Sequence, residues 1–132
     1  YHGEIARQAA RIENLAVPVL VSMHSFTPSW KGHPRGWEVG VLHDRDMRLA
    51  APLMARLAQA GFTVGDNEPY SGALEGDTLY THGTRFGRPH VLIEIRQDLV
   101  GDAGRAAACA ARLKPILDAA LQDMEDANGR QD

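Results

Sequence analysis

The sequence contains no long hydrophobic run, only one cysteine and no cluster of basic residues. Its apolar stretches are much shorter than the roughly 20 residues that a membrane-spanning helix needs, so we expect no contact with a membrane. Because Cys109 is the single cysteine, no disulfide can form within the chain, which fits the cytoplasmic location that we expect. A formal net charge of −3 with scattered Lys and Arg residues argues against nucleic acid as a partner.

The composition is that of a globular protein with one modest core. The chain has 132 residues, of which 44% are hydrophobic and 23% are charged, and this length suits a single domain. The sequence begins at Tyr1 rather than at a methionine, and a helical pattern starts almost at once. We therefore expect residues 1–132 to form one domain that belongs to a longer protein.

The spacing of apolar residues predicts alternating helices and strands. Helical periodicity predicts helices at residues 3–15, 46–60 and 102–126. Short apolar runs predict strands at residues 17–22, 38–43, 62–64 and 89–96, the first of them buried on both faces. This alternation predicts an α/β fold with three layers (α/β/α) and a mixed, mainly parallel sheet. The glycine-rich stretch 65–87 has little periodicity, and loops of that length are usually functional.

His24 is the first candidate for a functional residue, because it follows the first predicted strand. In open α/β sheets, binding sites form beyond the carboxyl ends of the strands. A neutral imidazole at such a place can bind zinc or act as a base. The alternative is a structural histidine whose ring is hydrogen-bonded to a backbone carbonyl at the strand end.

Glu94 is the second candidate, because it lies in the apolar fourth strand. An ionised carboxylate is costly to bury without a partner. Side chains alternate along a strand, so Glu94 and Arg96 share a face and could form a structural ion pair. In the functional interpretation, the Glu94 carboxylate accepts a proton from a water that a metal has activated.

Four segments in the same order resemble the N-formylglutamate amidohydrolase family. The first is Met-His-Ser-Phe-Thr-Pro at residues 23–28, and the second is Trp-Glu-Val-Gly-Val-Leu at 37–42 followed by Asp-Arg-Asp at 44–46. The third is Val-Gly-Asp-Asn-Glu-Pro-Tyr-Ser-Gly at 64–72. The fourth is His-Gly at 82–83 with His-Val-Leu-Ile-Glu-Ile-Arg-Gln-Asp-Leu at 90–99. The chain thus resembles the C-terminal half of such a catalytic domain.

This resemblance implies a zinc-carboxypeptidase-like (phosphorylase/hydrolase-like) fold and a zinc-dependent amidohydrolase. The family's reaction, a step of histidine degradation, hydrolyses the amide bond of N-formyl-L-glutamate to glutamate and formate. By the same resemblance, His24 is a ligand of one Zn²⁺ ion and Glu94 is the general base, which favours the functional interpretation of both residues. A catalytic zinc needs about three protein ligands, so the others are expected upstream of this chain, in an N-terminal half.

The resemblance also indicates how a small N-acyl amino acid would be bound. Tyr70 lies in the segment that matches a substrate-contacting loop of carboxypeptidases. Arg35 and Arg96 are candidates for the substrate carboxylate, because a guanidinium can bind it with two parallel hydrogen bonds. Two alternatives stay open, a carboxypeptidase-type peptidase and a non-catalytic binding or remnant domain. In each case we expect the isolated segment to be inactive.

Overall fold

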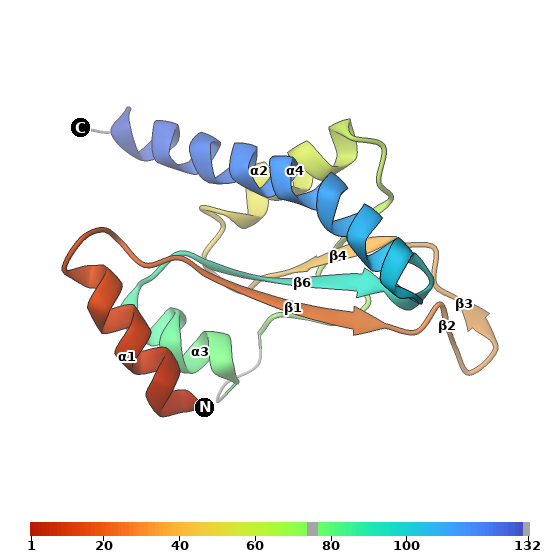
Figure 1. The fold of residues 1–132 in the computed structure, drawn as a ribbon, viewed down its shortest axis with the longest axis horizontal. Coiled ribbons are helices and arrows are strands. Elements are labelled where there is room, and N and C mark those ends of the chain that lie inside the picture. The colour runs from red at the N-terminus through yellow and green to blue at the C-terminus, as the bar shows by residue number, and fades with distance from the viewer. Residues whose placement is uncertain (74–76, 131–132) are drawn as a thin grey trace.

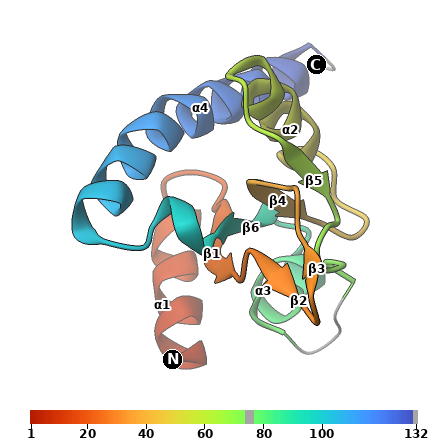
Figure 2. The ribbon, with the colours of Figure 1, turned by 90° about the vertical axis from the view of Figure 1, so that its right-hand side faces the viewer.

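The computed structural model describes residues 1–73 and 77–130 and has three layers. Helices α2 (Ala50–Gln59) and α4 (Ala103–Gly129) cover one face of the main sheet (Figures 1 and 2). Helices α1 (His2–Glu13) and α3 (Thr78–His82) lie on the other face. The predicted α/β/α architecture is confirmed.

The main sheet contains four strands in the order β1-β6-β4-β5. These strands are β1 (Leu20–Phe26), β6 (His90–Arg96), β4 (Val39–Leu42) and β5 (Val64–Asp66). The pairs β1–β6 and β4–β5 are parallel, whereas β4–β6 is antiparallel, so the sheet is mixed and mainly parallel as predicted. Strands β2 (Ser29–Trp30) and β3 (His33–Pro34) form a separate hairpin after β1, and two 3-10 turns, Thr84–Phe86 and Gln97–Leu99, flank β6.

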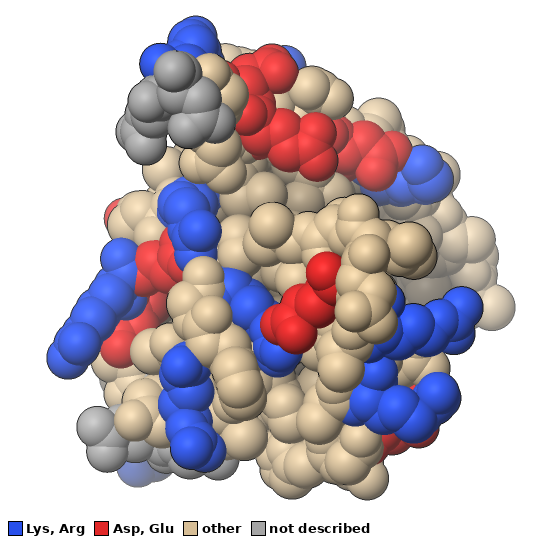
Figure 3. Space-filling view, turned by 90° about the vertical axis from the view of Figure 1, so that its left-hand side faces the viewer, with Lys and Arg blue, Asp and Glu red and all other residues tan. Residues whose placement is uncertain are grey.

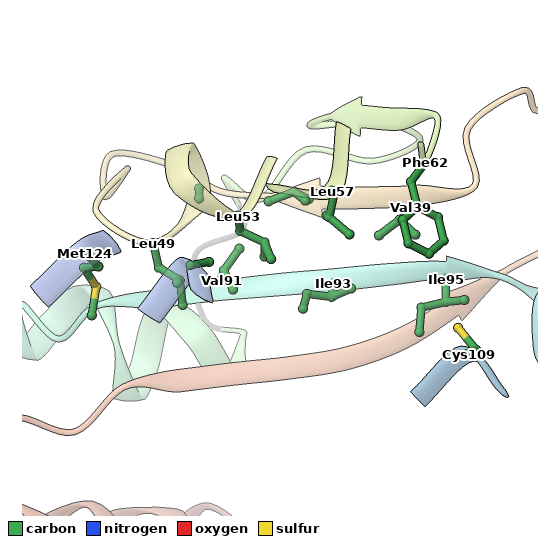
Figure 4. Packing of buried hydrophobic residues seen from close by; sticks show 13 residues of the cluster. Val39, Leu49, Leu53, Leu57, Phe62, Val91, Ile93, Ile95, Cys109 and Met124 are labelled. Carbon is green, nitrogen blue, oxygen red and sulfur yellow. The ribbon is translucent and has the colours of Figure 1, made fainter. Parts of the chain in front are cut away.

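The hydrophobic core lies between the sheet and the helices α2 and α4. Side chains alternate along each strand, so every second residue of β4 and β6 faces these helices. The buried core residues, many of them labelled in Figure 4, are Val39, Val41, Leu49, Leu53, Leu57, Phe62, Val91, Ile93, Ile95, Cys109, Ala120 and Met124. A bidentate contact from Arg56 to Asp123, at 2.8 and 2.9 Å, joins α2 to α4 at the rim of this core.

Helix α2 begins four residues later than predicted. The predicted helix spans residues 46–60, but the helix starts at Ala50, and Asp46 pairs with Arg48 in the segment before it. Pro52 explains the difference, because proline has no N–H to donate within a helix. A start at Ala50 places Pro52 in the first turn, where backbone N–H groups have no intrahelical partner.

Strand β1 is longer and more exposed than predicted. It runs through Met23 and His24 to Phe26, because its backbone keeps pairing with β6 over the full length of that strand. It also lies at an edge of the sheet, and three of its residues, Met23, His24 and Ser25, are exposed. The prediction of a strand buried on both faces was therefore wrong for β1, and His24 lies within the strand rather than after it.

The stretch 65–87 contains more regular structure than its glycine content indicated. Helix α3 forms within it, and the Asp77 carboxylate caps this helix by accepting a hydrogen bond from the Tyr80 N–H at 2.7 Å. A helix of five residues is too short to produce a visible apolar period, which is why the sequence pattern indicated a loop.

The two ends of the sheet have different surroundings. Strands β1 and β6 end beside the β2–β3 hairpin, which lies in front in Figure 2. At the opposite end, basic and acidic side chains lie next to one another (Figure 3), and Arg88 pairs with Glu13 at 2.6 Å. Among the described residues, no helix has the length and hydrophobicity needed to cross a membrane.

Replacing the core residue Leu53 with alanine should destabilise the fold. Leu53 is 1% exposed, and removing a buried leucine side chain costs about 2–5 kcal/mol because a cavity remains. Leu15→Ala is the matched control, since Leu15 is 87% exposed and its loss should change stability by less than about 0.5 kcal/mol. Urea unfolding of both variants measures the two free energies, and equal values would contradict this core.

Candidate active site

His24 and Glu94 lie side by side on the sheet face that carries α1 and α3. The parallel register pairs His24 directly with Glu94 across β1 and β6. The His24 Nδ1 atom is 3.7 Å from Glu94 Oε1. The imidazole is 55% exposed, whereas the Glu94 side chain is only 6% exposed. A buried carboxylate therefore lies directly behind an accessible histidine.

Gly40 makes room for the Glu94 side chain. It pairs with Glu94 from the other side, across β4 and β6. A Cβ atom at position 40 would collide with the carbonyl oxygen of Glu68 and would lie 3.4 Å from the Glu94 Cβ. The loop after β5 can thus approach the sheet only because this position is a glycine. Sequence reasoning missed Gly40, although a glycine inside a strand often marks a close approach.

Burial dominates the electrostatics of Glu94. It raises the pKa of the carboxyl group above its usual value, because the charged form loses its hydration. The nearby His24 and Arg35 oppose this effect and lower the pKa. Within the described residues, Glu94 Oε2 has no hydrogen-bond partner. A buried carboxyl group with a shifted pKa and an unpartnered oxygen is a candidate for a functional residue.

Arg96 does not pair with Glu94, so the structural ion pair considered as one interpretation of Glu94 is not formed. Its guanidinium binds both carboxylate oxygens of Asp98, at 2.6 and 3.0 Å. It also contacts the backbone carbonyls of Arg35, Gly36 and Trp37. The shared face was inferred correctly from alternation, but the turn after β6 brings Asp98 closer to Arg96 than Glu94 is. Arg96 therefore ties the turn after β6 to the segment that follows the hairpin.

Arg35 and Tyr70, predicted separately, lie in contact. The Arg35 Nη1 donates a hydrogen bond to the Tyr70 hydroxyl at 3.2 Å. Arg35 follows the β2–β3 hairpin, whose backbone is closed by a 2.8 Å bond from the Arg35 N–H to the Pro28 carbonyl. His24 and Arg35 both lie near enough to Glu94 to lower the pKa of its carboxyl group, and Tyr70 contacts Arg35.

Asn67 holds the loop that carries Tyr70, and sequence reasoning gave it no role. Its side-chain oxygen accepts hydrogen bonds from the backbone N–H groups of His43 at 2.8 Å and Gly72 at 3.1 Å. Asn67 has a positive φ of 54°, a conformation that asparagine adopts more readily than most residues. The sequence contains a hint of this role, because Asn67 lies in the third matching segment, residues 64–72, just before the loop. The Asn67 side chain thus ties the end of this loop at Gly72 to the backbone at His43.

His24 is an exposed histidine that lies next to a buried carboxylate. Among the described residues, its ring makes no hydrogen bond to a backbone carbonyl, so the structural role considered for it is not supported. By contrast, the rings of His43, His82 and His90 contact Asp66, His2 and Thr84 respectively. In residues 1–73 and 77–130, no three His, Cys, Asp or Glu side chains gather closely enough to hold a metal ion. In the part of the chain that the structure describes, His24 is thus an exposed imidazole beside a buried carboxylate, without a closed set of metal ligands around it.

Comparison with known protein families gives one match over most of the chain. The model of the N-formylglutamate amidohydrolase family matches residues 1–101. The chain belongs to this family. The family is one of hydrolases that act on amide bonds, and the match includes both His24 and Glu94. Comparison with curated individual proteins found no match.

Two crystal structures have the same fold as this chain. A gene product of Agrobacterium tumefaciens is 36% identical, with a TM-score of 0.86 over 95% of this chain and 50% of its own. An N-formylglutamate amidohydrolase from Ralstonia eutropha JMP134 is 19% identical, with a TM-score of 0.55 over 93% of this chain and 54% of its own. The chain therefore spans about half the length of each of these proteins.

Replacing Glu94 with glutamine should raise the melting temperature of the metal-free chain at neutral pH. Burial raises the folded-state pKa of Glu94 above the usual 4.5, so ionisation costs more in the folded than in the unfolded state. Below about pH 4.5 the group is neutral in both states and the difference vanishes. The stability gained by Glu94→Gln should therefore appear above this pH and grow as the pH rises.

Glu4→Gln is the control of opposite sign. Hydrogen bonds from Arg7 and Gln8 lower the pKa of Glu4, so its charged form stabilises the fold above about pH 4.5 and the variant should lose stability there. Thermal unfolding of both variants between about pH 4 and pH 8 in the presence of a chelator measures these changes. A lower melting temperature for Glu94→Gln at neutral pH would show that Glu94 is stabilised by an ion pair after all.

Proposed function

We propose that the protein carrying this chain hydrolyses the amide bond of N-formyl-L-glutamate, or of a related N-acyl amino acid. The products from N-formyl-L-glutamate are glutamate and formate. The observation that carries the proposal is the buried Glu94 carboxylate next to the exposed His24 ring, in a chain of the N-formylglutamate amidohydrolase family. Amide hydrolysis needs a base for the attacking water and a donor for the leaving nitrogen, and one carboxyl group can serve as both.

Glu94 moves the proton in this proposal. Its carboxylate takes a proton from the water whose oxygen attacks the formyl carbon. The same carboxyl group then gives the proton to the amine nitrogen as the C–N bond breaks. The burial that raises the pKa of Glu94 strengthens it as a base, while Arg35 keeps the ionised form accessible. A carboxyl group balanced in this way can exchange a proton within one catalytic cycle.

His24 would provide one ligand of a single Zn²⁺ ion. Its exposed imidazole and the unpartnered Oε2 atom of the adjacent Glu94 suit a metal-assisted hydrolase site. Zinc supplies Lewis-acid chemistry, polarising a carbonyl and making a water easier to deprotonate. A catalytic zinc takes about three protein ligands, and His24 is the one that this chain supplies. We propose that the remaining ligands come from residues outside it.

Arg35 and Tyr70 would bind the carboxylate of the substrate. Arg35 is half-buried near Glu94, and its Nη1 is already oriented by the Tyr70 hydroxyl. An ordered guanidinium loses little conformational freedom when it binds a carboxylate by donating two parallel hydrogen bonds. Arg96, also predicted as a substrate ligand, is held by Asp98, so in this proposal it supports the backbone that carries Arg35.

The surface beside β1 would receive the other half of the protein. Among the described strands, β1 pairs only with β6, so its outer edge presents free backbone groups. An apolar trough of about 280 Å³ lies beside it, under α4. Met23 lines this trough and is 52% exposed. Since the two similar crystal structures are about twice as long as this chain, we propose that an N-terminal half of the present protein pairs with β1 and fills the trough.

Two substitutions in the assembled enzyme test the catalytic proposal. Glu94→Gln keeps the shape of the side chain and removes its basicity, so kcat should fall by about 10²- to 10⁴-fold with the zinc content retained. His24→Ala should sharply lower the zinc stoichiometry. Glu4→Gln and His2→Ala, both on α1 and exposed, are the controls and should change neither quantity. Normal kcat in Glu94→Gln, or normal zinc content in His24→Ala, would refute the corresponding role.

The isolated chain should release no formate, even when loaded with zinc. It contributes one zinc ligand, and co-expression with the N-terminal half should restore both zinc binding and activity. Met23→Lys should block this restoration, because a charge would enter the apolar trough, whereas Met47→Lys at a partly exposed methionine elsewhere should not. An assembled protein without zinc or hydrolysis would favour the alternative of a non-catalytic binding domain.

A further inference from the structure

The guanidinium of Arg35 lies among three aromatic rings that come from different parts of the chain. Its central carbon is 5.8 Å from the Phe26 ring centre, 5.7 Å from Trp30 and 5.3 Å from Tyr70. Phe26 ends β1, Trp30 belongs to the β2–β3 hairpin and Tyr70 lies in the loop after β5. Each distance is within the range of about 6 Å at which a cation is attracted to an aromatic face.

In the described residues, one nitrogen of the Arg35 guanidinium donates hydrogen bonds to protein atoms and the other two do not. Its Nη1 donates to the Tyr70 hydroxyl at 3.2 Å and to the hydroxyl and carbonyl of Thr27 at 3.3 and 3.4 Å. Within the described part of the chain, Nε and Nη2 donate to no protein acceptor. A guanidinium presents five N–H groups in a planar fork. The fork is thus oriented by protein on one edge while N–H groups remain for an anion on the other.

Trp30 is the ring of the three that has no other evident task. Phe26 is 2% exposed and belongs to the interior, and Tyr70 is fixed by its hydrogen bond to Arg35. Trp30 is 58% exposed although exposing so large a ring to water is unfavourable. Its hairpin turns through Lys31 and Gly32, both with positive φ, and this tight turn brings Trp30 back beside Arg35.

We propose that Trp30 positions Arg35 for the α-carboxylate of the substrate and so determines the preference for N-acyl amino acids with a free α-carboxyl group. This inference rests on the proposed function, which supplies the substrate class. With the rings of Phe26 and Tyr70, Trp30 restricts the guanidinium plane, so that Nε and Nη2 meet both carboxylate oxygens at once. An arginine without this restraint would lose rotamer freedom on binding and bind the anion more weakly.

Trp30→Leu in the assembled enzyme tests the inference. An exposed cation–π contact contributes enough to raise KM for N-formyl-L-glutamate by about 2- to 5-fold, with kcat changed less than the KM. The α-carboxamide analogue of the same substrate cannot bind the fork in this way, so its kcat/KM should not change. Trp30→Phe should restore most of the preference for the acid over the amide, because it returns an aromatic face.

Two control variants isolate the role of Trp30. Phe86→Leu removes another exposed ring, which is 61% exposed and whose centre is 4.3 Å from the guanidinium carbon of Arg88. This ring lies away from the Arg35 cluster, so the change should leave the kinetics of both substrates unaffected. Lys31→Met removes the second cation near Trp30, which lies 5.8 Å from the ring centre, and it should leave the preference intact. An equal loss for acid and amide in Trp30→Leu, or the same loss in Phe86→Leu, would overturn the inference.

A binding measurement separates this inference from the proposed function. N-formyl-L-glutamate is titrated into the ¹⁵N-labelled chain while the Arg35 Nε–H resonance, assigned with Arg35→Lys, is followed. The shift should require about 2- to 5-fold more ligand in Trp30→Leu. If this holds while the assembled enzyme hydrolyses no N-acyl amino acid, the proposed function fails and the inference stands. If hydrolysis is observed but neither binding nor preference depends on Trp30, the inference fails and the function stands.

Discussion

The parallel pairing of β1 with β6 is the interaction on which the candidate site depends. His24 and Glu94 are far apart in the sequence, and the register from Leu20–His90 to Phe26–Arg96 makes them neighbours. A shift of one residue would turn one of the two side chains to the opposite face of the sheet. Packing opposes such a shift, because Val21 of β1, which packs against the core on the side of Val91 and Ile93, would then turn to the other face. Apolar packing on one face thus fixes the polar geometry on the other.

The environment of Glu94 balances opposing demands. Burial in the centre of the sheet favours the neutral acid, whereas the neighbouring His24 and Arg35 side chains favour the carboxylate. Gly40 admits both the Glu94 side chain and the loop at Glu68, so the carboxyl group is shielded without being held by a permanent partner. The ion pair of Arg96 with Asp98 removes the one arginine of the same strand that could have neutralised it. Among the described residues, Glu94 Oε2 is therefore left without a hydrogen-bond partner.

The remaining residues of the site come from irregular segments attached to the rigid sheet. The β2–β3 hairpin carries Trp30 and Arg35, and the loop anchored by Asn67 carries Tyr70. Sheets are well suited to hold catalytic groups in place, whereas loops vary easily and adjust which substrate is accepted. In the proposed function, the His24–Glu94 pair carries the chemistry and the Arg35 cluster carries the selectivity.

Local patterns in the sequence determined the order of helices and strands and the three-layer class, because apolar periodicity reflects which face of each element is buried. They also identified His24 and Glu94, since a histidine and a carboxylate in or beside an apolar strand are chemically conspicuous. The partner of Arg96, the contact of Arg35 with Tyr70, the space at Gly40 and the edge position of β1 were decided only by the tertiary structure. Each depends on segments far apart in the chain, and a periodicity that reports one element at a time contains no information about which other element will pack against it.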